Sequence, residues 1–239
     1  MQRGGGREDA RRGARIAAVA PAAIIAAGGR GARTGGEISK QFRLLRGRPL
    51  LRWSIDMLTE AGCDPIVVAA PLQDMDQMRS LLSGEVDVAV VEGGSTRQES
   101  VANGLAQVTS DVVLVHDAAR PFAPVDLARA VLKATEAAEG AVPAVPVDET
   151  IKRVESDSVV ETVDRSTLWR VQTPQAFRTA TLAEAHRRSR SEGFVATDDA
   201  QLIENYGGRV VIVRGTRTNI KLTYPEDFAL AEAIAGGLE

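Results

Sequence analysis

AAIIAAGGRGAR, residues 22–33, decides the fold, because six apolar residues run directly into a glycine-rich loop. A short apolar run that ends at glycines is typical of a buried strand. Glycines at a strand end let backbone N–H groups approach phosphate oxygens, and Arg33 and the nearby Lys40 add fixed positive charge. We interpret the stretch as the first strand of an α/β domain and its nucleotide loop. A flexible βα turn with solvated cations is the alternative.

Two familiar phosphate loops do not match this stretch. A Walker A loop needs Gly-Lys-Ser/Thr, whereas Lys40 follows Ser39 and precedes a glutamine. A dinucleotide fingerprint needs a third glycine three residues after Gly31, where Thr34 stands, and an acid at the end of the second strand, where residues 69–71 read AAP. These differences argue against a P-loop NTPase and against an NAD-dependent oxidoreductase.

Composition limits the classes of partner. The chain has 239 residues, 44% of them apolar, and its 29 basic and 32 acidic residues give a formal charge of −3. No overall positive field would recruit nucleic acid or an anionic membrane, and Arg30 closes the apolar run before it could span a bilayer. Cys63 is the single cysteine, which suits a reducing cytoplasm, and His116 and His186 lack the third ligand that a zinc site needs. We expect a cytoplasmic protein that binds neither nucleic acid nor membrane.

Beyond the first strand, short β-branched runs alternate with longer helical patterns, which is typical of a mostly parallel sheet with helices on both faces. We expect one domain over residues 16–239 and a disordered extension over residues 1–15. Further strands are predicted at residues 66–70, 86–91, 112–116, 140–145 and 209–214. Helices are predicted at residues 49–62, 74–82, 96–107, 125–139, 180–192, 198–206 and 225–235.

One segment breaks this alternation. Residues 151–163 read IKRVESDSVVETV, two short runs around a Ser-Asp-Ser turn, which predicts a β-hairpin. A hairpin without its own core is only marginally stable alone. We therefore expect a projecting β-arm over about residues 148–166 that packs on another surface, such as the same arm of a second subunit.

Two more motifs follow predicted strands, at the edge where open α/β sheets bind ligands. EGGSTRQES, residues 92–100, opens a helix, so its glycines and hydroxyls could receive a base or a phosphate; Ser95 as a plain N-cap is a compatible alternative. VHDAARP, residues 115–121, contains Asp117, which could hold a divalent cation or a substrate hydroxyl, and Arg120, which could meet a phosphate. A buried structural ion pair would explain that motif equally well.

The motifs occur in an order that resembles one enzyme family. AAGGRGAR with KQ, EGGSTRQES, VHDAARP, PVDETIKR, TVDRSTLWRVQTPQAF, TDDAQLIE and NIKLTYPED are together similar to the 2-C-methyl-D-erythritol 4-phosphate cytidylyltransferases of the non-mevalonate isoprenoid pathway. The resemblance runs from about residue 22 to the C-terminus. It implies a Rossmann-like nucleotidyltransferase domain that transfers CMP from CTP to 2-C-methyl-D-erythritol 4-phosphate and releases pyrophosphate. It also implies Mg2+ as cofactor and a homodimer formed through the arm.

The resemblance further implies roles for individual residues. Arg33 and Lys40 match positions that stabilise the transition state; Arg165 and Lys221 match positions that place the substrate phosphate, with Arg165 reaching the neighbouring subunit. Asp117 is a candidate Mg2+ ligand, although we expect the triphosphate to hold most of the metal. Positions that hold the nucleotide and its cytosine are matched by Ala26, Ala27, Gly28, Gly29, Gly94, Ser95, Arg97, Ser100 and Ala118. Positions around the substrate polyol are matched by Asp117, Arg120, Thr150, Thr173 and Thr197.

Two positions depart from the family pattern: Ser39 stands where proline is usual, and Ser95 stands where aspartate is common. Neither removes a charge that the chemistry needs, so we expect these changes to alter affinity more than mechanism. Two alternative functions stay open at this point. One is a cytidylyltransferase that acts on ribitol 5-phosphate, and the other is a module that binds CTP without turnover.

Overall fold

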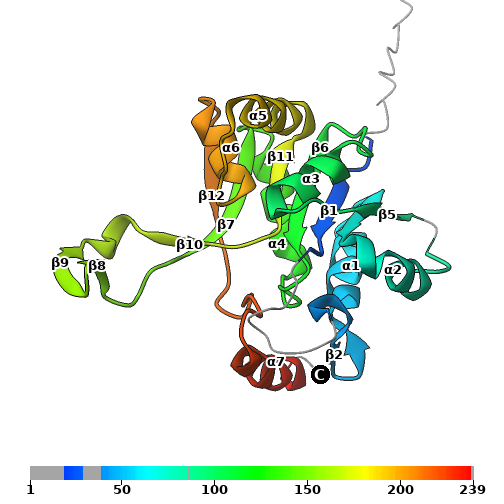
Figure 1. The fold of residues 1–239 in the computed structure, drawn as a ribbon, viewed down its shortest axis with the longest axis horizontal. Coiled ribbons are helices and arrows are strands. Elements are labelled where there is room, and N and C mark those ends of the chain that lie inside the picture. The colour runs from blue at the N-terminus through cyan, green and yellow to red at the C-terminus, as the bar shows by residue number, and fades with distance from the viewer. Residues whose placement is uncertain (1–18, 29–38, 86, 238–239) are drawn as a thin grey trace, which may run out of the picture.

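The computed structural model describes residues 19–28, 39–85 and 87–237. Figure 1 shows a central sheet with helices packed around it and a thin arm that projects to one side. The predictions made for residues 1–15, for Gly29 and for Arg33 lie outside the described residues.

The central sheet has eight strands in the order β10-β7-β11-β6-β1-β4-β5, with β12 paired to β7. Strands β1 (Ala22–Ala26), β4 (Ile66–Ala70), β5 (Val88–Glu92) and β6 (Val112–Asp117) form its parallel half. Strands β7 (Gly140–Pro146) and β12 (Val210–Arg214) are parallel to each other. The prediction of a mostly parallel sheet is therefore confirmed, and each of the predicted strands is present.

Two strands of this sheet were not predicted. β11 (Gln175–Arg178) lies between β6 and β7 and is antiparallel to both, and β10 (Trp169–Val171) is antiparallel to β7. Both are short, and Pro174 lies between them, so no periodic pattern marks them in the sequence. Their insertion makes the sheet mixed and brings Gln172 and Thr173 to the carboxyl end of β6.

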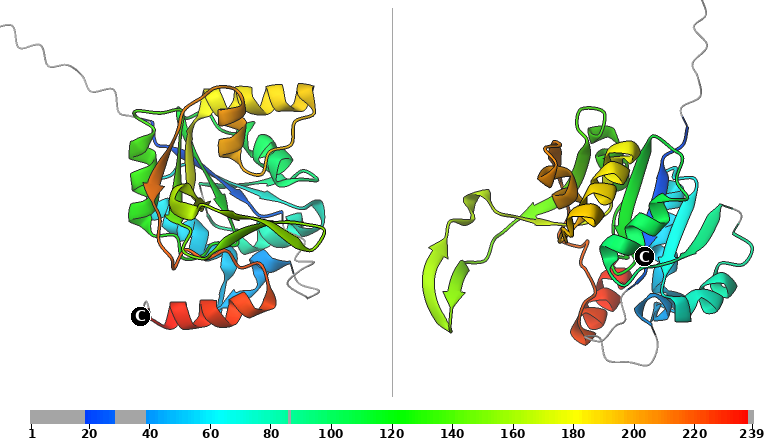
Figure 2. Two further views of the ribbon diagram at one scale, coloured as in Figure 1. Left: turned by 90° about the vertical axis from the view of Figure 1, so that its left-hand side faces the viewer. Right: turned by 45° about the horizontal axis from the view of Figure 1, so that its top comes forward.

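Helices cover both faces of the sheet, as predicted (Figure 2). Neighbouring residues of β1 point to opposite faces: Ile25 packs in a core with side chains of α1, α2 and α4, whereas Ile24 packs with side chains of α3, α5 and α6. The helices are α1 (Leu50–Glu60), α2 (Met75–Leu81), α3 (Arg97–Leu105), α4 (Val125–Ala134), α5 (Thr179–Glu192), α6 (Asp199–Asn205) and α7 (Pro225–Gly236). Helix α4 ends five residues before its predicted end. None of the helices in the described ranges has the length and apolar content that a membrane crossing requires.

The C-terminal helix α7 packs against residues 43–49, in the segment that follows the glycine-rich loop. It packs on the small sheet of β2 (Leu44–Leu45) and β3 (Arg48–Pro49), where Leu45, Leu222 and Ala231 share a third apolar cluster. The guanidinium of Arg43 lies 3.7 Å from the ring centre of Phe228 on α7. These contacts bring the chain around Lys40 and the chain around Lys221 together at one end of the sheet.

The predicted hairpin is confirmed. Strands β8 (Ile151–Glu155) and β9 (Ser158–Val163) pair antiparallel and form a sheet of their own. Ser156 and Asp157 both have positive φ angles, as a tight two-residue turn requires. In Figures 1 and 2 the hairpin stands away from the main body. Val154, Val159 and Val160 are exposed on it, so the arm has apolar surface that its own chain leaves uncovered.

Candidate active site

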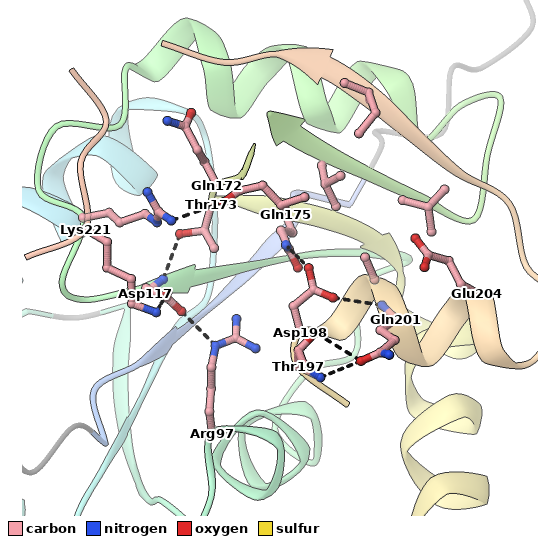
Figure 3. Close-up of a pocket in the computed structure, with 16 residues that line it drawn as sticks. Arg97, Asp117, Gln172, Thr173, Gln175, Thr197, Asp198, Gln201, Glu204 and Lys221 are labelled. Carbon is pink, nitrogen blue, oxygen red and sulfur yellow. Dashed lines mark hydrogen bonds and ion pairs between the residues drawn. The ribbon is translucent and has the colours of Figure 1, made fainter. Parts of the chain in front are cut away.

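A cavity of about 650 Å3 opens at the carboxyl end of β6 (Figure 3). Open α/β sheets bind their ligands at this edge. The lining includes six of the residues predicted from the sequence: Arg97, Asp117, Arg120, Thr173, Thr197 and Lys221. They come from α3, β6 and four later segments, so the fold gathers residues that are up to 124 positions apart in the chain.

Asp117, the last residue of β6, sits between two cations. Its Oδ1 accepts a hydrogen bond from Nε of Arg97 at 2.8 Å, and its Oδ2 lies 2.7 Å from Nζ of Lys221. Burial alone would raise the pKa of this carboxyl, because only 10% of the side chain is exposed. Arg97 and Lys221 outweigh burial and hold the pKa far below its ordinary value. Asp117 is therefore a fixed negative charge that orders two positive ones in the cavity wall.

Asp199, which sequence reasoning missed as a site residue, binds the other side of Arg97. Its Oδ2 lies 2.6 Å from Nη1 of Arg97, and its Oδ1 lies 3.3 Å from Nε2 of His186 on α5. The side chain is 1% exposed; burial would raise its pKa, but Arg97 and the hydrogen bond from His186 hold the pKa below its ordinary value. Arg97 is thus clamped between two carboxylates. The only trace in the sequence is a second acid directly after the helix N-cap Asp198.

His116 begins a chain of hydrogen bonds that fixes Thr173. The amide N–H of Asp117 donates to Oγ1 of Thr173 at 3.1 Å, and Thr173 is 2.9 Å from Nδ1 of His116. Nε2 of His116 is 3.1 Å from the carbonyl oxygen of Arg120, so the proton is assigned to Nε2 and Nδ1 accepts. Burial lowers the pKa of His116 to about 4, so the ring is neutral at pH 7. His116 is therefore a hydrogen-bonded, neutral histidine near the end of β6.

Arg120 ties neighbouring loops to β6. Its Nη1 donates to the carbonyl oxygen of Asn219 at 2.8 Å and its Nη2 to that of Val171 at 3.3 Å. The side chain of Asn219 in turn donates to the carbonyl oxygen of Thr173 at 2.8 Å. Burial lowers the pKa of Arg120, and the nearby Asp117 opposes that shift only in part. One guanidinium nitrogen therefore holds the segment before Lys221, and the other holds the end of β10.

A second cavity, of about 620 Å3, lies at the carboxyl ends of β1, β4 and β5. No lysine or arginine is among the lining residues in the part of the chain that the structure describes; they are Gly28, Pro71, Leu72, Gln73, Glu92, Gly93, Gly94 and Ser95. Described lining residues that include no cation and one acidic side chain, Glu92, suit a neutral ring better than a phosphate group. We refer to it as the uncharged cavity, and to the one around Asp117 as the cationic cavity.

The loop of residues 93–95, which lines the uncharged cavity, leaves none of its three amide N–H groups free. The N–H of Gly93 donates to the carbonyl oxygen of Ala70 at 2.7 Å, that of Gly94 to Oγ of Ser100 at 3.1 Å, and that of Ser95 to Oε2 of Glu99 at 2.7 Å. A phosphate would need those donors. Of the two ligands considered for this loop, the hydrogen bonds therefore favour a base over a phosphate.

The N-cap of α3 is Thr96. Its Oγ1 accepts a hydrogen bond from the N–H of Glu99 at 3.1 Å, whereas the hydroxyl of Ser95 points to the Glu99 carboxylate. The interpretation of Ser95 as the N-cap is therefore wrong by one residue. The Ser95 side chain is left to face the cavity.

Other predicted residues take up varied places. The ends of β1 and β6 place Ala26, Ala27 and Ala118 beside the uncharged cavity's Gly28, with the N–H of Ala118 bonded to the carbonyl oxygen of Ala26 at 3.3 Å. Nζ of Lys40 donates to the carbonyl oxygen of Leu222 at 2.5 Å, next to Lys221.

Two predicted residues lie elsewhere in the single chain. Thr150 directly precedes β8, and Arg165 follows β9 and donates to the carbonyl oxygen of Asp148. Neither lines the cationic cavity of its own chain. The prediction that Arg165 serves a neighbouring subunit stays a prediction.

An enzyme that joins a nucleotide to a second phosphorylated molecule needs room for both reactants at one edge of its sheet, and the two cavities supply it. By fold and site, the chain is a nucleotidyltransferase. The family model for 2-C-methyl-D-erythritol 4-phosphate cytidylyltransferase matches residues 21–236. The chain therefore belongs to that family of CTP-dependent nucleotidyltransferases.

Similar proteins agree with this assignment. The chain is 42% identical over 217 residues to 2-C-methyl-D-erythritol 4-phosphate cytidylyltransferase of Bacillus velezensis, which covers 88% of this chain and 94% of the relative. It is 41% identical over 214 residues to the enzyme of that name from Aquifex aeolicus, with 90% and 97% covered. The crystal structure of the Thermus thermophilus enzyme superposes with a TM-score of 0.78 at 36% identity, covering 91% of this chain and 100% of the other.

Proposed function

We propose that this chain transfers CMP from CTP to 2-C-methyl-D-erythritol 4-phosphate, giving 4-diphosphocytidyl-2-C-methyl-D-erythritol and pyrophosphate. The single observation that carries the assignment of the site is Asp117, which holds Arg97 and Lys221 in the wall of the cationic cavity. The acceptor's phosphate and hydroxyl groups find cations and hydrogen-bonding side chains there. The cytosine of CTP occupies the uncharged cavity, and the triphosphate lies between the two.

The reaction is a direct in-line attack. An oxygen of the acceptor's phosphate monoester attacks the α-phosphorus of CTP, a new P–O bond forms, and the bond to the β-phosphate oxygen breaks to release pyrophosphate. Two polyanions meet in this step, so catalysis is mainly positioning and stabilisation of negative charge by fixed cations. Lys221 and Arg97 act on the acceptor side, and Lys40 acts at the α-phosphate together with Arg33.

No covalent intermediate is needed. The only cysteine of the chain, Cys63, is buried in the apolar core, and burial raises its pKa to about 12. A thiol with so high a pKa is not a nucleophile at neutral pH. The free, buried state of Cys63 also supports a proposed location in the cytoplasm, because the fold requires no disulfide.

The donor set fits a metal ion that is held mainly by phosphate. No group of three or more histidine, cysteine, aspartate or glutamate side chains in the described ranges could hold a metal by itself. Asp117, Asp198 and Glu204 are the carboxylates among the described lining residues of the cationic cavity, and both oxygens of Asp117 contact cations. We propose that Mg2+ enters with CTP, where it supplies neutralisation of triphosphate charge, and that Asp117 would be its protein ligand only after Lys221 moves away.

We further propose a homodimer that pairs through the arm. The exposed valines of β8 and β9 supply apolar surface for such an interface. Arg165 and Thr150 lie at the ends of the arm and do not line the cationic cavity of their own chain. In a dimer, both would reach the acceptor in the partner's cavity, so each site would be built from two chains.

The test is an assay of product formation. Purified protein is incubated with CTP, MgCl2 and 2-C-methyl-D-erythritol 4-phosphate, and pyrophosphate release is followed together with 31P NMR of the diphosphate product. Parallel reactions contain ribitol 5-phosphate or no acceptor. We expect kcat/KM for the methylerythritol substrate to exceed that for ribitol 5-phosphate at least tenfold. The reverse order would assign the acceptor to ribitol 5-phosphate, and CTP binding without pyrophosphate release would leave only a nucleotide-binding module.

A further inference from the structure

The hydroxyl of Ser95 has a fixed direction. Oγ of Ser95 donates its hydrogen to Oε2 of Glu99 at 2.7 Å. A serine hydroxyl that is free to rotate can either donate or accept, so it cannot tell a donor from an acceptor on a ligand. With its hydrogen committed to Glu99, the Ser95 oxygen offers only lone pairs to the uncharged cavity, which it lines.

Glu99 is held in place to receive that hydrogen. The same Oε2 accepts the backbone N–H of Ser95 at 2.7 Å, and the N–H of Glu99 donates to Oγ1 of the N-cap Thr96 at 3.1 Å. The carboxylate also needs Gly94: a Cβ there would lie 2.1 Å from Cβ and 2.8 Å from Oε2 of Glu99. The bonds from the hydroxyl and the amide of Ser95 hold the pKa of Glu99 below its ordinary value, so the group is ionised at pH 7 and cannot donate a hydrogen back.

The rest of the loop offers no backbone donor at residues 93–95. Because the amides of Gly93, Gly94 and Ser95 are all bonded within the protein, none of these three N–H groups is left to donate to a ligand. Cytosine carries an amino group at C4, which donates hydrogen bonds. Uracil carries a carbonyl oxygen at C4, which would face lone pairs with no hydrogen between them.

We propose that Glu99 determines nucleotide specificity: by fixing the Ser95 hydroxyl as an acceptor, it selects the amino group of cytosine over the carbonyl of uracil. Glu99 is a positioning residue, since it acts through Ser95 and does not touch the base. The inference rests on the proposed function only in taking CTP as the nucleotide substrate.

The test compares CTP with UTP in three variants. Ser95→Ala removes the hydroxyl but keeps the backbone N–H that bonds Glu99. Glu99→Gln keeps the side-chain length but can donate an N–H to Ser95, which frees the hydroxyl hydrogen. Gln98→Ala is the matched control, because the side-chain bonds of Gln98, on the same turn of α3, run to Ser189, Phe194 and Ala196 and not to Ser95 or Glu99. The readout is the ratio of kcat/KM for CTP to that for UTP, with the Tm of each variant measured in parallel.

We expect Ser95→Ala and Glu99→Gln each to lower the CTP-to-UTP ratio about tenfold, the effect of one hydrogen bond. The variant that combines Ser95→Ala with Glu99→Gln should lower the CTP-to-UTP ratio no further than either single variant, because both changes remove the same contact. Gln98→Ala should lower the Tm and leave the ratio unchanged. A ratio within twofold of wild type in Ser95→Ala or Glu99→Gln would overturn the proposal, as would an equal loss for both nucleotides.

Failure of this proposal can be told apart from failure of the proposed function. If the wild type forms the methylerythritol product while the variants keep its nucleotide ratio, only the role of Glu99 is overturned. If the wild type binds nucleotide without turnover, the same ratio is measured as dissociation constants for CTP and UTP by titration calorimetry. Equal affinity of the wild type for CTP and UTP would overturn the role of Glu99 in either case.

Discussion

Asp199→Asn is expected to lower kcat/KM for the acceptor because Asp199 holds Arg97 across the cationic cavity. Asparagine has the same size but no charge, so the ion pair at 2.6 Å from Nη1 of Arg97 becomes a hydrogen bond from the guanidinium to an uncharged oxygen. The amide can also satisfy only one of Arg97 and His186 with its single oxygen. Charge-assisted hydrogen bonds contribute about 1.5–3 kcal/mol, against about 1 kcal/mol for neutral ones.

The expected magnitude follows from those contacts. The change replaces an ion pair by a hydrogen bond to an uncharged oxygen and leaves the Arg97 charge with one carboxylate partner in place of two. We expect a loss of about 0.5–2 kcal/mol of transition-state stabilisation, the difference between the two kinds of bond, which is about a two- to thirtyfold fall in kcat/KM. His186→Gln should have a smaller effect, within about threefold, because it touches Asp199 at the longer contact.

The assay is steady-state kinetics combined with a double-mutant cycle. Asp199→Asn, Arg97→Lys and the double variant are compared, and circular dichroism verifies that each is folded at the assay temperature. If Asp199 acts through Arg97, the double variant should be little worse than Arg97→Lys alone. Additive losses, or a kcat/KM for Asp199→Asn within twofold of wild type, would refute this reasoning.

Three further predictions concern the cations and the buried histidine. Lys40→Ala or Arg33→Ala should cut kcat by about 10²–10³ with an unchanged circular dichroism spectrum, the cost of losing one contact to transition-state charge; turnover within threefold of wild type would contradict these roles. Arg165→Ala and Lys221→Ala should each raise KM for the acceptor more than they weaken binding of CTP. If Arg165 serves the partner's site, mixing the two impaired variants should restore part of the activity, because one site of the mixed dimer keeps both side chains. Mixtures that show no such gain under conditions of subunit exchange would argue against a shared site. The free energy of unfolding should fall as the pH drops from about 6.5 to about 4, because the unfolded chain takes up a proton at His116 in this window while the folded chain, with the pKa lowered to about 4, does not. The fall should approach about 1.4 kcal/mol per pH unit and should be smaller in His116→Gln; identical slopes for the two proteins in urea titrations would contradict the buried neutral state.

The parallel half of the fold could be predicted because its strands are continuous apolar runs separated by amphipathic helices. β1 and β4 are buried along nearly their whole length, so their composition alone marks them. β10 and β11 could not be predicted in this way, since each has three or four residues and Pro174 lies between them. Their pairing depends on β6 and β7, which are distant in sequence.

Those site residues that lie at the ends of strands could be predicted from the sequence. Asp117 ends β6, and its position at the carboxyl edge follows from the strand. The partner of Arg97 was not predictable, because Asp199 is 102 residues away and only the packing of α6 beside α5 brings it near. That Thr96 and not Ser95 is the N-cap of α3 was not predictable either. It depends on the direction of the Glu99 carboxylate, which bonds Ser95, and the spacing of residues does not determine that direction.

The convergence of Arg97, Lys221 and Lys40 around two phosphorylated ligands is tested most directly by a crystal structure with CTP, Mg2+ and 2-C-methyl-D-erythritol 4-phosphate bound. The account predicts cytosine beside Ser95, the acceptor in the cavity of Asp117 with its phosphate near Lys221, and the α-phosphate within reach of Lys40. It would be contradicted by either ligand lying outside these two cavities, or by an α-phosphorus that no oxygen of the acceptor phosphate can approach in line.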